Sequence, residues 1–125
     1  MSEKTMDEKE AYYNIQLKQV SLEQEIKDRE IRKQEQRLND FQELETIEQR
    51  FYSESFHSEL DKPTNNFFQQ AVDESRWLAR EEREHLETRN EELHVEKRLL
   101  LAKEDELLMA RKQLFIEKGS DSTWD

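Results

Sequence analysis

The sequence predicts an all-α protein, an antiparallel two-helix hairpin of long, coiled-coil-like helices that completes a bundle with partner helices. Three observations point to this fold class. Glycine and proline occur once each in 125 residues, whereas sheets and barrels need frequent turns. Charged residues make up 41% of the chain and hydrophobic residues 33%, far from a globular composition. Apolar residues recur at every seventh position in the second half, as in a coiled coil.

The first helix is predicted over about residues 5–60. Thr5 and Glu8 have the spacing of a capping box, in which each side chain accepts a hydrogen bond from the other residue's backbone N–H. Apolar residues then follow a helical stripe at Tyr13, Leu17, Val20, Ile31, Leu38 and Phe41. A second, neighbouring stripe is formed by Ile15, Leu22 and Ile26.

The midpoint of the chain is marked by Pro63, which disfavours a helix interior by about 3 kcal/mol. We predict a connection over 61–66, with the second helix capped by Thr64, Asn65 or Asn66. That helix is predicted over about 65–118 and ends at Gly119, followed by a frayed tail over 119–125. The whole chain, 1–125, is predicted to form one hairpin domain.

One column of the second helix is apolar at every seventh residue and is predicted to form the seam of the hairpin or bundle. Its members are Val72, Ala79, Leu86, Leu93, Leu100, Leu107 and Leu114. The positions three and four residues after each member carry mostly polar side chains, so the predicted seam is narrow. Folding at Pro63 pairs residue i with roughly residue 126 − i, and the apolar stretches of the two helices then coincide.

Aromatic residues gather at the two ends of the predicted hairpin. Adjacent aromatics on a helix point about 100° apart, so one of each pair is expected to face away from the seam. Exposed apolar clusters mark interfaces. The predicted partner-binding residues are Phe51, Tyr52, Phe56, Phe67, Phe68, Trp77, Tyr12, Tyr13 and Phe115. The plain alternative is that they only close the two ends of the hairpin.

Composition and charge exclude several function classes. A net charge of −11 disfavours binding to nucleic acid or anionic lipid, and the absence of cysteine excludes disulfides and cysteine-ligated metals. The longest apolar runs have four residues, as in Leu99–Ala102, and are far too short to span a membrane. The charged N-terminus does not resemble a signal peptide. We therefore expect a cytoplasmic protein, whose export, if any, would proceed without a cleaved signal.

No catalytic constellation is found, so the sequence predicts a protein that is not an enzyme and carries no cofactor. The remote enzyme hypothesis is a metal-binding bundle, because Glu-x-x-His occurs twice, at Glu82, His85, Glu91 and His94. Both copies lie on one helix, whereas such bundles take the motifs from different helices, so no metal site is predicted.

Three arginines, Arg76, Arg80 and Arg83, form a basic strip on the second helix. We interpret this strip as a solvated face paired with nearby glutamates of the same helix, in preference to a dock for an acidic partner. The glutamates in question are Glu81, Glu84 and Glu87.

This small, acidic, cysteine-free hairpin, with aromatics near its turn and a Glu/Lys/Leu-rich stretch over 96–114, resembles a known family. It is similar to the LXG-associated α-helical proteins, the Lap family, of Gram-positive type VII secretion. The resemblance implies a chaperone or targeting adaptor that binds the helical N-terminal LXG domain of a secreted toxin, with or without a second small helical protein. Two features of related secreted hairpins are missing. Trp77 is not followed by x-Gly, and Phe41–Glu45 has the shape of an export signal but lies mid-helix.

Two functional hypotheses therefore stay open. The leading one is the toxin-binding adaptor, and it allows a homodimer when the client is absent. The other is a self-associating coiled-coil scaffold, an antiparallel four-helix homodimer. Neither involves nucleic acid or insertion into a membrane.

Overall fold

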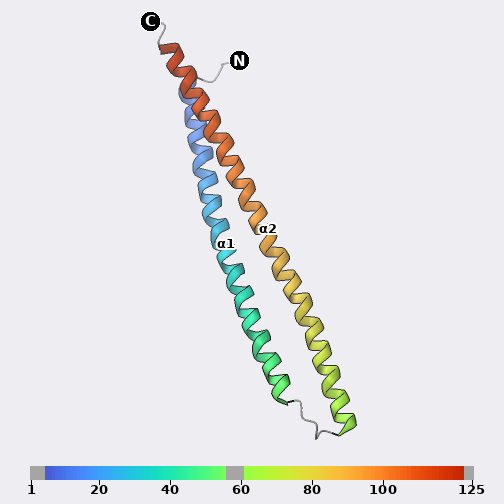
Figure 1. The fold of residues 1–125 in the computed structure, drawn as a ribbon. Coiled ribbons are helices and arrows are strands. Elements are labelled where there is room, and N and C mark those ends of the chain that lie inside the picture. The colour runs from blue at the N-terminus through green and yellow to red at the C-terminus, as the bar shows by residue number, and fades with distance from the viewer. Residues whose placement is uncertain (1–4, 56–60, 123–125) are drawn as a thin grey trace. The chain divides into compact units, whose positions relative to one another are not determined.

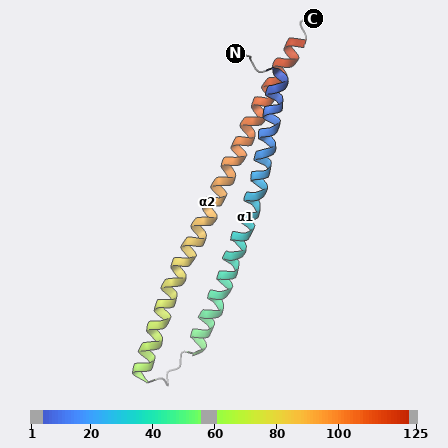
Figure 2. The ribbon, with the colours of Figure 1, turned by 180° about the vertical axis from the view of Figure 1, so that it is seen from behind.

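The computed structural model describes residues 5–55 and 61–122, with side chains described as far as Gly119. Within these ranges the chain forms two helices, α1 (Met6–Ser55) and α2 (Lys62–Ser122), and no strand. Figures 1 and 2 show them running in opposite directions. The predicted fold class, an all-α antiparallel hairpin, is confirmed.

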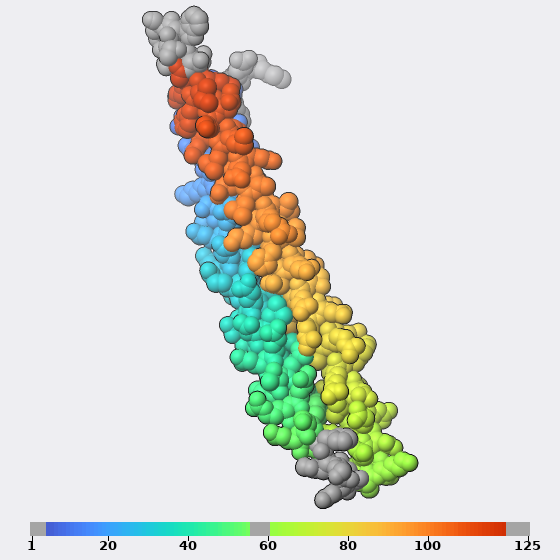
Figure 3. Space-filling model, in the orientation of Figure 1, coloured from blue at the N-terminus to red at the C-terminus, as the bar shows by residue number. Residues whose placement is uncertain are grey.

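The chain divides into two compact units, each containing a segment of both helices. Unit 1 comprises Met1–Glu30 and Leu93–Asp125, and unit 2 comprises Ile31–Glu92. In unit 1 the blue start of α1 lies against the orange and red end of α2. In unit 2 the green end of α1 lies beside the yellow start of α2 (Figures 1 and 3). Each unit is therefore a single pair of antiparallel helix segments.

The N-terminus of α1 is the predicted capping box. The Thr5 N–H donates to Glu8 Oε2 at 3.3 Å, and the Glu8 N–H donates to Thr5 Oγ1 at 3.2 Å. The Lys9 N–H also donates to the Thr5 carbonyl oxygen at 3.0 Å. These bonds satisfy backbone groups that have no partner inside the helix, so the prediction is confirmed.

The predicted start of α2 is wrong, because the helix begins at Lys62 and its cap is Asp61. Asp61 Oδ1 accepts a hydrogen bond from the Thr64 N–H at 2.9 Å, and its carbonyl oxygen accepts one from Asn65 at 2.9 Å. Pro63 then lies in the first turn, where a backbone N–H would have no helical partner, so it does not break the helix. The end of the first helix, predicted near residue 60, falls outside the described residues, since α1 is described to Ser55.

The far end of α2 also differs from the prediction, because the helix passes Gly119 and continues to Ser122. Gly119 does not adopt the positive φ of a helix stop. Lys118, just before the glycine, bonds across the hairpin through its Nζ to Asp7 Oδ1 at 2.8 Å and Glu10 Oε2 at 3.3 Å. The Lys118 hydrogen bond lowers the pKa of Asp7 and raises that of Lys118. Residues 123–125 of the predicted tail lie outside the described residues.

All seven members of the predicted seam are buried or half-buried. In unit 1 Leu93 and Leu114 are buried together with Val20 of α1, and in unit 2 Val72 and Ile31 are buried. The other four seam residues, Ala79, Leu86, Leu100 and Leu107, are half-buried. The seam is thus a single apolar column along α2 that packs against α1.

Beside this column, cross-helix polar contacts fill the positions that the sequence left without apolar residues. In unit 1 Lys97 Nζ lies 2.5 Å from Asp28 Oδ1, and Lys27 Nζ lies 2.7 Å from Glu96 Oε2. The hydrogen bond to Glu96 raises the pKa of Lys27. In unit 2 Gln34 Nε2 donates to the Leu86 carbonyl oxygen at 3.0 Å. The apolar column is therefore flanked by cross-helix ion pairs and hydrogen bonds.

Because the Asp61 carboxylate accepts hydrogen bonds from Thr64, its pKa is lowered. A lowered pKa adds stability above the unfolded value, near pH 4, and that stability is lost as acid protonates the carboxyl group. We expect Asp61→Ala to reduce helicity and thermal stability at neutral pH, whereas Asp61→Asn, a good cap, should preserve both. Circular dichroism melts at pH 7 and pH 3 check this, and equal melts for Asp61→Ala and wild type at pH 7 would contradict it.

Candidate functional site

The residues predicted to bind a partner separate into two structural groups, with Phe56 outside the described residues. Three lie half-buried between the helices, namely Tyr13, Tyr52 and Phe68. The rest are exposed, namely Tyr12 and Phe115 in unit 1 and Phe51, Phe67 and Trp77 in unit 2. In each adjacent aromatic pair one ring faces inward and the other outward, as predicted.

The inward aromatics of unit 2 hold the hairpin together. The rings of Tyr52 and Phe68 meet edge to face, with centroids 5.9 Å apart. The Tyr52 hydroxyl donates to Glu48 Oε1 at 3.0 Å. We therefore assign Tyr52 and Phe68 to the hairpin seam and leave the outward residues as candidates for docking.

An apolar stripe lies on the outer surface of α1 in unit 2. Leu44, Ile47 and Phe51 follow an i, i+3, i+7 spacing, which places them on one side of the helix. Their exposed fractions lie between 61% and 63%. On α2, Phe67 and Leu78 are eleven residues apart, about three turns, so they also share one side.

These two sets lie on the same face of unit 2, as a pocket on its opposite face shows. The pocket is lined by Gln49 of α1 and Arg80 of α2, among others. Ile47 is two residues from Gln49, and Leu78 is two residues from Arg80. Two residues correspond to a rotation of about 200° around a helix, so Ile47 and Leu78 each point away from the pocket. We call the surface of Leu44, Ile47, Phe51, Phe67 and Leu78 the apolar face.

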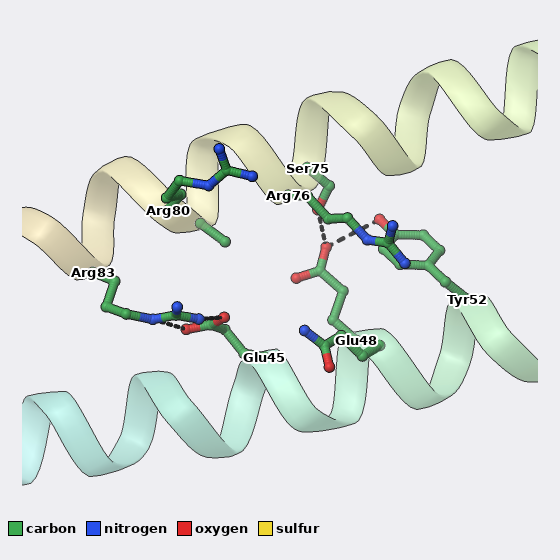
Figure 4. Close-up of a pocket in the computed structure, with 9 residues that line it drawn as sticks. Glu45, Glu48, Tyr52, Ser75, Arg76, Arg80 and Arg83 are labelled. Carbon is green, nitrogen blue, oxygen red and sulfur yellow. Dashed lines mark hydrogen bonds and ion pairs between the residues drawn. The ribbon is translucent and has the colours of Figure 1, made fainter.

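The opposite face is charged and is hollowed by the pocket, whose volume is about 180 Å³. Figure 4 shows Arg83 reaching from α2 to Glu45 of α1, and the Arg83 Nε donates to Glu45 Oε1 at 3.1 Å. The other guanidinium branch pairs with Glu45 Oε2, and Ser75 donates to Glu48. Both glutamates are thereby engaged in contacts that join α1 to α2.

The predicted pairing of the arginine strip with glutamates of its own helix is wrong for Arg83, which bonds to Glu45 across the hairpin. The reason is that the antiparallel register places Glu45 directly opposite. Arg76 and Arg80 are exposed, and no carboxylate lies within ion-pair distance of either in the described part of the chain. An acidic partner would find these two guanidinium groups accessible.

The two Glu-x-x-His motifs do not assemble into a metal centre in the part of the chain that is described. No group of three or more candidate ligands lies together within residues 5–55 and 61–122. His85 lies in an exposed hollow with Glu81 and Glu84, and His94 is half-buried. Glu82 and Glu91 are exposed.

No helix in the described ranges contains an apolar stretch long enough to cross a membrane. Comparison with known proteins finds no matching protein family, no matching curated protein and no matching solved structure.

The sequence predicted Phe51, Phe67 and Trp77 as partner-binding residues, and all three are exposed. It gave the same role to Tyr13, Tyr52 and Phe68, which are half-buried. It did not assign Leu44, Ile47 and Leu78 to the docking surface. The signal was present, because Leu44, Ile47 and Phe51 have helical spacing. The sequence does not show that this stripe lies outside the seam, because two neighbouring apolar stripes on one helix have the same spacing.

Proposed function

We propose that this chain is a non-enzymatic interaction protein whose apolar face packs against a helix of a partner protein. The observation that carries the proposal is the exposure of five large apolar side chains on one face of unit 2, with Phe67 at 73%. Large apolar side chains gathered on one face are costly to leave in water and are typical of protein interfaces.

The spacing of these side chains favours a helical partner. Residues at i, i+3 and i+7 on α1, beside a second stripe on α2, form the kind of two-helix surface that a third helix covers in a bundle. Unit 2 would then gain the core that two helices alone cannot build. The accessible Arg76 and Arg80 on the opposite face offer a second contact for an acidic segment of the same partner.

The resemblance to the Lap family supports a particular client, the helical N-terminal LXG domain of a type VII secreted toxin. In this proposal the chain acts in the cytoplasm as a chaperone or targeting adaptor. It keeps the toxin's helical domain soluble and helps deliver it to the secretion machinery, alone or with a second small helical protein. The client's identity rests on the resemblance, whereas the docking face rests on the exposed side chains.

The test is co-purification of the tagged chain from its native host, followed by mass spectrometry. We expect an LXG toxin with the wild type and its loss with the double variant Phe51→Glu, Phe67→Glu. Losing one interface hot spot weakens binding about thirtyfold or more, so two buried charges should abolish recovery. Circular dichroism should show unchanged helix content, because both residues are exposed.

Leu99→Glu, the same kind of change at an exposed residue of unit 1, is the matched control and should retain the client. Recovery of the client with the double variant would contradict the docking face. A client that is lost with the double variant but has no LXG domain would keep the docking face and overturn its assignment to toxin delivery. Recovery of the chain alone, as a salt-resistant dimer, would favour the scaffold hypothesis.

A further inference from the structure

A second apolar column runs along α2 in unit 1, one residue beyond the seam. Leu101, Leu108 and Phe115 are spaced by seven residues and directly follow Leu100, Leu107 and Leu114. Their exposed fractions are 38–45%, so a large part of each side chain remains accessible to solvent. A seven-residue apolar repeat is the signature of a helix–helix seam, and the hairpin uses only the first of these two columns.

The charges beside this column are arranged symmetrically about Leu108. Glu104 and Asp105 precede it by four and three residues, and Arg111 and Lys112 follow it by three and four. Glu104 and Arg111 are half-buried on the side nearer the seam, and Asp105 and Lys112 are exposed on the outer side. If the segment is reversed about Leu108, each acidic position is therefore replaced by a basic one, and each basic position by an acidic one.

We propose that this segment binds the same segment of a second copy of the chain in antiparallel orientation. We call it the self-complementary strip, and it consists of Leu101, Glu104, Asp105, Leu108, Arg111, Lys112 and Phe115. Leu108 of one copy faces Leu108 of the other at the twofold axis, and Leu101 faces Phe115. Asp105 then lies beside Lys112 of the second copy and Glu104 beside its Arg111. Each pair occurs twice, as a twofold interface requires.

The charges also select the orientation and the partner. A parallel, in-register pair would place Asp105 beside Glu104 of the second copy and Lys112 beside its Arg111, which is repulsive. The strip itself carries two acids and two bases, so it is neutral on a chain whose net charge is −11. A neutral patch is where two such acidic molecules can approach each other.

The hairpin's own contacts are compatible with this pairing. Arg111 Nη1 donates to Asn14 Oδ1 at 3.0 Å within unit 1. A guanidinium carries five N–H donors, so further donors remain for Glu104 of the second copy. The strip lies in unit 1 and the apolar face in unit 2, so the pairing goes beyond the proposed function and does not depend on it.

The first experiment measures the mass of the full chain by light scattering across a concentration series. We expect the wild type to approach the dimer mass and Leu108→Glu to remain a monomer, because it places two carboxylates at the twofold axis. Leu99→Glu is the matched control, since nine residues correspond to two and a half turns and put it on the opposite side of α2. It should dimerise like the wild type, and circular dichroism verifies that all three are helical.

The second experiment exchanges the charges. Asp105→Lys and Lys112→Asp should each weaken self-association by about tenfold, because each sets like charges beside each other twice. A one-to-one mixture of the two variants restores both pairs across chains and should form a heterodimer. The double variant Asp105→Lys, Lys112→Asp should recover the homodimer.

A monomeric wild type at every concentration would overturn the inference. Equal dissociation by Leu99→Glu and Leu108→Glu, or failure of the mixture to associate, would also overturn it. The outcome is separable from the proposed function, because Leu108→Glu should still recover the client. Conversely, the variant Phe51→Glu, Phe67→Glu should still dimerise.

Discussion

Replacing Leu93 by alanine should lower the free energy of unfolding by about 2–5 kcal/mol, the range found for large-to-small changes in protein cores. Leu93 is 2% exposed and is one of the two largest fully buried side chains of the described residues. A single pair of helices has no further layer that could collapse into the cavity. Typical domains have only about 5–15 kcal/mol of net stability, so the loss would be a large share of the total.

Urea denaturation followed by circular dichroism measures this change, with both proteins at the same concentration because self-association would add to apparent stability. Leu99→Ala is the matched control, since Leu99 lies on the same helix but is 66% exposed. It should change stability by less than about 0.5 kcal/mol. Equal losses at the two positions would show that Leu93 does not hold the seam.

The second large effect is expected at the ion pair between Arg83 and Glu45. The Glu45 side chain is 11% exposed, whereas the Arg83 side chain is 42% exposed. Arg83→Ala would leave a buried carboxylate without its cation, at a cost of about 1–3 kcal/mol in the free energy of unfolding. The partly exposed arginine keeps this below the cost of breaking a fully buried pair.

The double variant Glu45→Leu, Arg83→Leu should recover most of the stability lost in Arg83→Ala, because no charge remains to be desolvated. Arg80→Ala is the matched control, since Arg80 has no carboxylate within ion-pair distance among the described residues. Its free energy of unfolding should stay within about 0.5 kcal/mol of wild type. If Arg83→Ala behaves like Arg80→Ala, the pair contributes nothing to the hairpin.

Helix ends were predicted correctly where the local sequence allows only one interpretation. Thr5 and Glu8 form the predicted box, since both of its hydrogen bonds are made within one turn. The start of α2 was misread because Asp61, Thr64 and Asn65 are all competent caps and sequence alone does not rank them. The end of α2 was misread because a glycine can end a helix or merely weaken it, and Gly119 lies without a positive φ in a helix that continues to Ser122.

The candidate docking surface was predicted in part. Their position next to another aromatic in the sequence identified Phe51 and Phe67 as members of aromatic pairs, and the structure places both outside the hairpin. It places Tyr52 and Phe68 inside, where their rings meet. Which member of a pair faces inward depends on the rotation of each helix against the other, and that rotation is set by the whole seam.

The sequence by itself determined the two helices, their antiparallel pairing and the apolar column from Val72 to Leu114. These follow from the small number of turn-forming residues, a single proline and a seven-residue apolar period. All three can be recognised without knowing how the helices pack. Only the tertiary structure decided that Arg83 bonds to Glu45, that Lys97 bonds to Asp28, and that unit 2 has one apolar and one charged face. The reason is physical, because a charged side chain has several partners within reach along its own helix, and only the register of the opposing helix selects among them.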